Sequence, residues 1–281
     1  MANYYNLITG LPDLLIDDGR PTYSVSQFKE MCEENLTDKD RKILYYFFLR
    51  MDCLNIVTLL KDPTAHVALC GNLSEEECRQ LIEESDEINT EVPCGAPRFL
   101  MDFILTYPER KEAEYFFAED AVLLEYYRYA MHCSNKDVAA WFELNFNIIN
   151  ILTACLARNY GWDVKHYVLN DNEVSDIILK NVQVKDFNLS PIIDYVDDIL
   201  KIAAVEDPVQ KEKNIDAFKW AWLENNTFFE QFSLFAVFAY LCKLEMKERW
   251  SNLDVETGKA TFTQIVDNLR DEVRVPDEFR K

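Results

Sequence analysis

The residues that could bind a metal ion are few and widely separated in this sequence. Its three histidines, His66, His132 and His166, lie far apart, and none belongs to the H-E-x-x-H pattern that places two zinc ligands on one helix face. Asp163 stands three residues before His166, which is a ligand-like spacing. A di-metal helical bundle, however, needs two such motifs and further glutamates from other helices. The sequence therefore predicts no metal site.

The sequence also lacks the motifs of nucleotide binding and of covalent catalysis. The Gly258-Lys259 pair is preceded by Asp-Val-Glu-Thr and followed by alanine, so it does not form the G-x-x-x-x-G-K-[ST] phosphate loop. With 50 aspartates and glutamates in the chain, no two carboxylates can be singled out as general acid and base. No serine or cysteine has the flanking residues of a known nucleophile. We therefore expect no catalytic residue, no cofactor and no small-molecule substrate.

Two polar pairs with the same spacing are a stronger signal. Asp52 and Asn55 lie three positions apart in a mostly apolar segment, and so do Asn147 and Asn150. A buried polar group that lacks a hydrogen bond costs about 1 to 3 kcal/mol, so such groups are almost always paired. We expect these pairs to tie helix ends or loops together inside a helical module. A contact with a partner protein is the alternative.

The two polar pairs belong to an internal repeat. Alignment of Tyr46 with Trp141 gives five identities within about sixteen positions, together with several conservative replacements. Thr37 and Ser134 precede the two copies, and each has the character of a helix N-cap. The repeat therefore indicates two related helical modules. The identical positions are Phe47/Phe142, Leu49/Leu144, Asn55/Asn150, Ile56/Ile151 and Thr58/Thr153.

Composition predicts a mostly α-helical protein. Gly (6) and Pro (9) are scarce and concentrated in a few places, while 49% of the residues are hydrophobic, which suffices for a large core. We expect a single helical domain over residues 1–281, with possible modules at 1–90, 97–187 and 188–281. After a short arm at 3–12, helices are expected at 24–34, 38–61, 74–88, 99–105, 109–131, 134–159, 173–180, 190–205, 209–223, 228–252 and 261–272.

Charge and targeting signals restrict the possible partners. A formal charge of −21 opposes binding to DNA or RNA, because that affinity depends on neutralising phosphates with lysine and arginine. The first residues lack the basic start and long apolar run of a signal peptide, and no segment reads as a membrane span. Eight scattered cysteines without a C-x-x-C pair suit a reduced, cytosolic protein with buried thiols.

Four segments together resemble a known family. They are NYYNLITGLPDL, YYFFLRMDCLNIVTLLKD with its D-x-x-N core, WFELNFNIINILTACLARNYGWD and FAVFAYLCKLEMKERW. The chain resembles the C subunit of V-type (archaeal and bacterial A-type) ATPases, the family that includes the eukaryotic d subunit. It is similar in particular to the shorter, divergent form encoded in V-type ATPase operons of Bacteroidetes-like bacteria.

The resemblance implies an all-α, funnel-like array of three related helical modules without an active site. It also implies a non-catalytic central-stalk subunit at the cytoplasmic face of the inner membrane. Such a subunit links the central shaft to the membrane proteolipid ring during proton or sodium transport, and remains peripheral to the bilayer. The third module would fall at residues 241–250, where Glu245 and Glu248 match the polar pairs only loosely.

Two regions are candidate partner contacts. We expect the N-terminal arm and the charged half of the late helix, residues 243–250, to meet the ring, and an acidic interior to receive a basic end of the shaft. A helical scaffold or adaptor unrelated to the ATPase is the main alternative, and a helical enzyme is a third. The candidate contact residues are Tyr4, Tyr5, Lys243, Lys247, Arg249 and Trp250.

Overall fold

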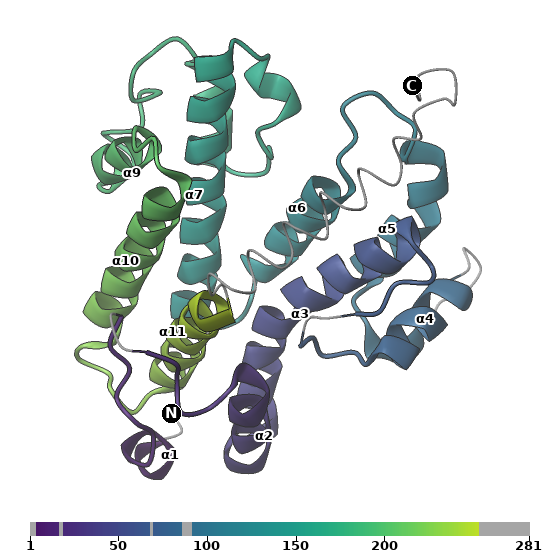
Figure 1. The fold of residues 1–281 in the computed structure, drawn as a ribbon, viewed down its shortest axis with the longest axis vertical. Coiled ribbons are helices and arrows are strands. Elements are labelled where there is room, and N and C mark those ends of the chain that lie inside the picture. Colours follow the sequence, from purple (N-terminus) through teal and green to yellow (C-terminus); the bar gives the residue numbers. More distant parts are fainter. Residues whose placement is uncertain (1–3, 17–18, 68–69, 86–91, 253–281) are drawn as a thin grey trace, which may run out of the picture.

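The computed structural model describes residues 4–16, 19–67, 70–85 and 92–252 (Figure 1). Within these ranges the chain contains helices and connections but no β-strand, which confirms the expected all-α class. The helix expected at 261–272 lies outside the described residues. The α-helices are α1 (Tyr5–Thr9), α2 (Val25–Asn35), α3 (Asp38–Lys61), α4 (Glu75–Glu83), α5 (Arg98–Arg110), α6 (Ala118–Ala130), α7 (Lys136–Tyr160), α8 (Glu173–Lys180), α9 (Val196–Ala203), α10 (Pro208–Thr227) and α11 (Leu234–Asn252), and the short 3₁₀ helices are η1 (Pro93–Gly95) and η2 (Val164–His166).

Several helices begin where local capping chemistry predicts. The Thr37 hydroxyl accepts a hydrogen bond from the backbone N–H of Asp40 and so starts α3. Ser74 forms a complete capping box at α4, and Asp207 caps α10 ahead of Pro208. The cap expected at Ser134 is wrong by one residue. The longer side chain of Asn135 accepts from two N–H groups of the first turn of α7, each at 3.1 Å.

The expectation that one helix spans 109–131 is wrong for its first part. Helix α5 continues to Arg110, a reversal follows at 111–117, and α6 begins only at Ala118. Tyr115 adopts a left-handed backbone conformation (φ 60°), which no continuous right-handed helix allows. The reversal brings Phe116 back against Tyr107, with ring centroids 6.3 Å apart. Aromatic residues that resemble one helical stripe in the sequence therefore belong to two packed segments.

Two further helix starts also lie later than expected. Residues 190–195 form turns, since the Ser190 hydroxyl bonds to the Asp186 carboxylate, and α9 begins only at Val196. Helix α10 runs on to Thr227, and a turn at 228–233 separates it from α11. The Ser-Pro pair at 190–191 thus begins a turn, whereas the Asp-Pro pair at 207–208 begins a helix.

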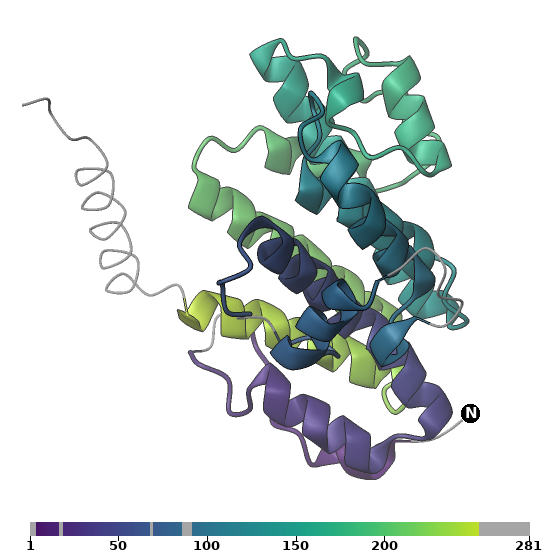
Figure 2. The same cartoon turned by 90° about the vertical axis from the view of Figure 1, so that its right-hand side faces the viewer.

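The helices form two groups that meet at α11. Helix α3 packs against α6 in one group, and α7 packs against α9 in the other. Helix α11 contacts α7, α10 and α2, and Figure 2 shows α2 lying along it. One continuous hydrophobic core includes residues from every described α-helix. By length and composition, α3 and α7 could cross a membrane, but 61% and 67% of their most apolar windows are buried within the protein, as in core helices.

Candidate functional site

The first polar pair holds the segment that leads into α4. The carboxylate of Asp52, which is fully buried, accepts hydrogen bonds from the Asn72 amide (2.7 Å) and the Leu73 backbone N–H (2.9 Å). The Asn72 amide also donates to the Tyr45 carbonyl at 3.1 Å. Burial raises the pKa of Asp52, although the two hydrogen bonds oppose this shift. Asn55, one helical turn further on, is also buried.

Close packing around Asp52 requires a glycine. A Cβ atom added to Gly71 would lie 2.0 Å from Asp52 Oδ1, so no other residue fits there without movement. The Gly71 carbonyl accepts a hydrogen bond from Lys29 Nζ at 2.7 Å, and the same ammonium lies 4.9 Å from the centre of the Phe48 ring. We call the contacts of Asp52 with Asn72 and Leu73 the polar clamp of α3. Helix α2 is thereby connected to this clamp.

The second polar pair makes equivalent contacts in α7. The Asn150 side chain donates to the Leu169 carbonyl (2.9 Å) and accepts from the Leu169 N–H (2.8 Å). Asn147 accepts from the Asn172 amide at 2.8 Å and donates to the Tyr195 hydroxyl at 3.0 Å. Asn172 is the N-cap of α8. In both modules, therefore, a long buried helix uses polar side chains to hold the segment that starts the next short helix.

Two lysines in the charged half of α11 have partners inside the fold. Lys247 is only 6% exposed, and its ammonium donates to the Leu15 carbonyl. Lys243 bonds to Glu224 at 3.1 Å and lies over the Trp220 ring. Helix α11 packs against α2, α7 and α10 together, which places these partners within reach, and the expected contact of residues 243–250 with the ring stays a prediction.

The N-terminal arm, residues 4–16, is fastened to α11. Its first described residue, Tyr4, is buried, its hydroxyl donates to Asp40, and its N–H donates to the Phe232 carbonyl at 3.0 Å. Tyr240 donates to the Pro12 carbonyl at 3.1 Å. Tyr5 is 54% exposed and packs on Phe232. Of the two arm tyrosines proposed as partner contacts, Tyr5 is the one whose ring is accessible.

A cavity of about 350 Å³ lies where the two helix groups meet. Helices α3, α6 and α7 contribute a wall that is mostly aromatic and aliphatic, while α10 and α11 contribute most of the charged side chains. This volume is at the lower end of the range for small-molecule sites. The aromatic side chains of the lining are Phe47, Tyr126, Tyr127, Trp141 and Phe142.

Part of the charge in this cavity is already paired. Arg249 binds the buried carboxylate of Asp216 through two contacts of 2.5 and 2.7 Å and reaches the more exposed Glu212 at 3.4 Å. The indole N–H of Trp250 also donates to Asp216, at 2.6 Å. Both oxygens of the Asp216 carboxylate therefore have partners. Two of the proposed partner contacts, Arg249 and Trp250, meet at this ion pair.

The remaining cavity charges have no ion-pair partner among the described residues. These are Lys219 on α10, Arg50 on α3 and Glu245 on α11. Burial, which disfavours the charged ammonium, lowers the pKa of Lys219 to about 8. Burial also raises the pKa of Glu245. Sequence reasoning missed this group because the three residues come from three helices, and each one alone resembles an ordinary surface charge.

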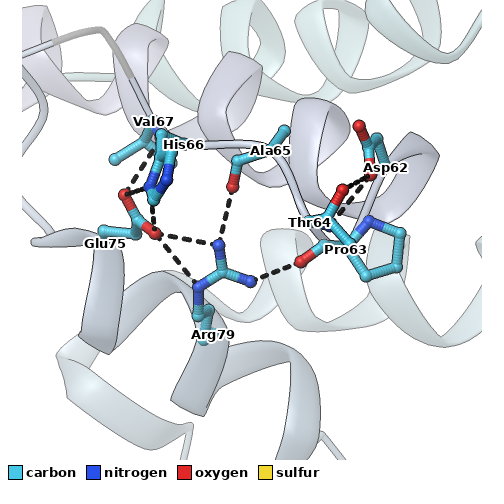
Figure 3. Close-up of polar contacts among 8 residues, drawn as sticks. All are labelled: Asp62, Pro63, Thr64, Ala65, His66, Val67, Glu75 and Arg79. Atoms are coloured by element: carbon cyan, nitrogen blue, oxygen red, sulfur yellow. Dashed lines mark hydrogen bonds and ion pairs between the residues drawn. The ribbon is translucent and has the colours of Figure 1, made fainter.

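One histidine, His66, belongs to a structural network. His66 is exposed and contacts Glu75, whose carboxylate also binds Arg79 at 2.8 Å (Figure 3). Arg79 donates to the carbonyls of Pro63 (2.7 Å) and Ala65 (2.6 Å), so this network closes the connection from α3 to α4. In the described part of the chain, no group of three or more His, Cys, Asp or Glu residues could hold a metal ion.

These features define a class: an all-helical protein with two related polar clamps and a charged internal cavity. Comparison with known families then places the chain. The family described as "Protein of unknown function (DUF2764)" matches residues 1–273, and the chain belongs to this family. No curated protein and no solved structure matches it significantly.

Proposed function

We propose that this protein is a non-catalytic central-stalk subunit of a rotary V-type ATPase, connecting the central shaft to the proteolipid ring. The proposal rests on the resemblance of four segments to the C subunit of that complex. The observation that carries it furthest is the repeated clamp of α3 and α7, because the resemblance implies repeated helical modules. Asp52 and Asn147 hold the start of the following short helix in the same way.

A coupling subunit must not unfold locally while it transmits torque. Long helices with buried, hydrogen-bonded connections resist such opening better than exposed loops do. The clamps supply these connections, and one core runs through all the described helices. This construction supports a mechanical role, in which the protein works as a peripheral component on the cytoplasmic face of the inner membrane and moves no proton or sodium ion itself.

A connecting subunit also needs two separate contact surfaces. Exposed aromatic side chains occur near the α10–α11 turn, where Phe229 is 91% exposed beside Phe228. Others occur where α7 ends, where Tyr160 packs on Trp162 with centroids 5.0 Å apart. Figure 1 shows these two parts of the chain toward opposite ends of the long axis. Aromatic residues are enriched at protein interfaces, so both groups are suitable contact points.

Reconstitution tests this proposal. The protein is mixed separately with the shaft subunits and with detergent-solubilised ring from the same operon, at low ionic strength. We expect both complexes to form, and the shaft complex to weaken as salt screens the attraction between acidic and basic surfaces. Phe229→Ser and Trp162→Ser should each weaken one complex and spare the other. Val209→Ser, at an exposed apolar residue outside both groups, is the control.

If neither the shaft complex nor the ring complex forms, the ATPase assignment is wrong. The helical scaffold or adaptor would then be the better proposal, since clamps and repeated helices serve that role equally well. Co-purification of the native complex from membranes would distinguish the two proposals without any reconstitution.

A further inference from the structure

We propose that the cavity between the two helix groups binds a small organic anion, whose acid group lies between Arg50, Lys219 and Arg249 and whose apolar body packs on the aromatic wall. The inference concerns a ligand site inside the protein. It does not depend on the ATPase role, because it rests on the cavity lining, to which Phe229 and Trp162 do not belong.

The distribution of side chains in the cavity favours a ligand with two unlike parts. The wall from α3, α6 and α7 presents Phe47, Tyr126, Trp141 and Phe142. Helices α10 and α11 present most of the charged groups, and Arg50 of α3 adds one more. A purely apolar ligand would leave these charges without partners, and a bare inorganic ion would leave the aromatic wall uncovered. A ring or chain that carries one acid group would satisfy both walls.

The sign of the free charge favours an anion. Asp216 is already occupied by Arg249 and Trp250, so it offers little attraction to a cation. Lys219 and Arg50 form no ion pair with any described residue, whereas two of the three cavity carboxylates, Asp216 and Glu212, are already bound by Arg249. Taking a charge out of water is costly unless a partner compensates it. A bound carboxylate or phosphate would provide that partner.

An orphaned donor points to the same end of the cavity. The Nε of Arg249 is buried and has no hydrogen-bond partner, and it is the one such side-chain atom in the part of the chain that the structure describes. Buried polar atoms of this kind are rare and usually indicate a missing water or ligand. Arg249 lines the cavity together with Lys219 and Arg50. An acid oxygen placed among the three would accept a hydrogen bond from the unsatisfied group.

The test compares an acid with its neutral counterpart. The purified full chain is titrated with 2-naphthoate and with 2-naphthamide by isothermal titration calorimetry. The two probes share the apolar body and differ in the acid group. We expect the acid to bind at least tenfold more tightly than the amide, because charge-assisted hydrogen bonds are the stronger kind. Equal affinities, or no binding of the acid, would overturn the proposal.

Two variants then locate the site. Lys219→Met and Arg50→Met should each reduce the affinity for 2-naphthoate at least tenfold, whereas Lys213→Met, at an exposed residue of the same helix as Lys219, should not. Lys219→Met should melt no lower than the parent, because it removes an unpaired buried charge. If either cavity variant fails to fold, the other decides. Acid binding that survives substitution in the cavity contradicts the assignment.

Discussion

Replacement of Asn150 by leucine tests whether the polar clamp of α7 is structural. Leucine branches at Cγ as asparagine does but is larger and apolar, so the change removes two hydrogen bonds to Leu169, of 2.9 and 2.8 Å. A fully buried group left without its partner costs about 1 to 3 kcal/mol. Leu169 is half-buried, so water can reach it in part. We therefore expect the free energy of unfolding to fall by about 2 to 3 kcal/mol in total.

Urea unfolding followed by circular dichroism measures this loss. Asn159→Leu, at an exposed position of the same helix, should change the free energy of unfolding by no more than about 0.5 kcal/mol. Asn55→Leu, at the equivalent buried position of α3, should cost about 1 to 3 kcal/mol. If Asn150→Leu and Asn55→Leu unfold like the parent but lose partner binding, the clamp reasoning is wrong and these residues are contact residues.

Three further predictions concern other parts of the fold. Gly71→Ala should lower the free energy of unfolding by about 1 to 3 kcal/mol, because the added methyl collides with the Asp52 carboxylate, whereas Gly19→Ala, with nothing within 4 Å, should not. Because the pKa of Asp52 is raised, the folded state retains a proton that the unfolded state releases. The free energy of unfolding of the parent should therefore fall, relative to that of Asp52→Asn, as pH rises from about 4 through that raised pKa. A difference in urea midpoints that does not change with pH would contradict this. A thiol reagent should label exposed Cys70 first in the native protein and reach buried Cys53 only on unfolding, which mass spectrometry can follow; early labelling of Cys53 would refute its burial.

The helical class and several helix starts could be predicted because their signals are local. A hydroxyl or carboxylate that caps a helix acts on N–H groups two or three residues away, as at Thr37, Ser74 and Asp207. Local signals also have limits. The pairs Ser190-Pro191 and Asp207-Pro208 have the same pattern, yet only the second begins a helix. The Ser190 hydroxyl instead bonds to the Asp186 carboxylate within a turn.

The cavity and the orientation of α11 could not be predicted because they depend on tertiary packing. Arg50 and Lys219 are separated by more than half the chain and line one cavity only in the folded protein. Lys247 occupies a segment whose composition is typical of a solvated helix face. Its burial depends on the carbonyl of Leu15, which comes from the opposite end of the described chain.

The attachment of the N-terminal arm to α11 has a consequence for synthesis on the ribosome. The Tyr240 hydroxyl bonds to Pro12 across a separation of 228 residues. At about 5 to 20 residues per second, translation leaves roughly 11 to 46 s between the appearance of the two partners. During that interval the arm lacks the contacts that the late segment supplies, which are those of Tyr4 with Phe232 and of Pro12 with Tyr240. The nascent chain is therefore a natural client for a ribosome-associated chaperone, and ribosomes that stall before α11 should release a product that proteases remove.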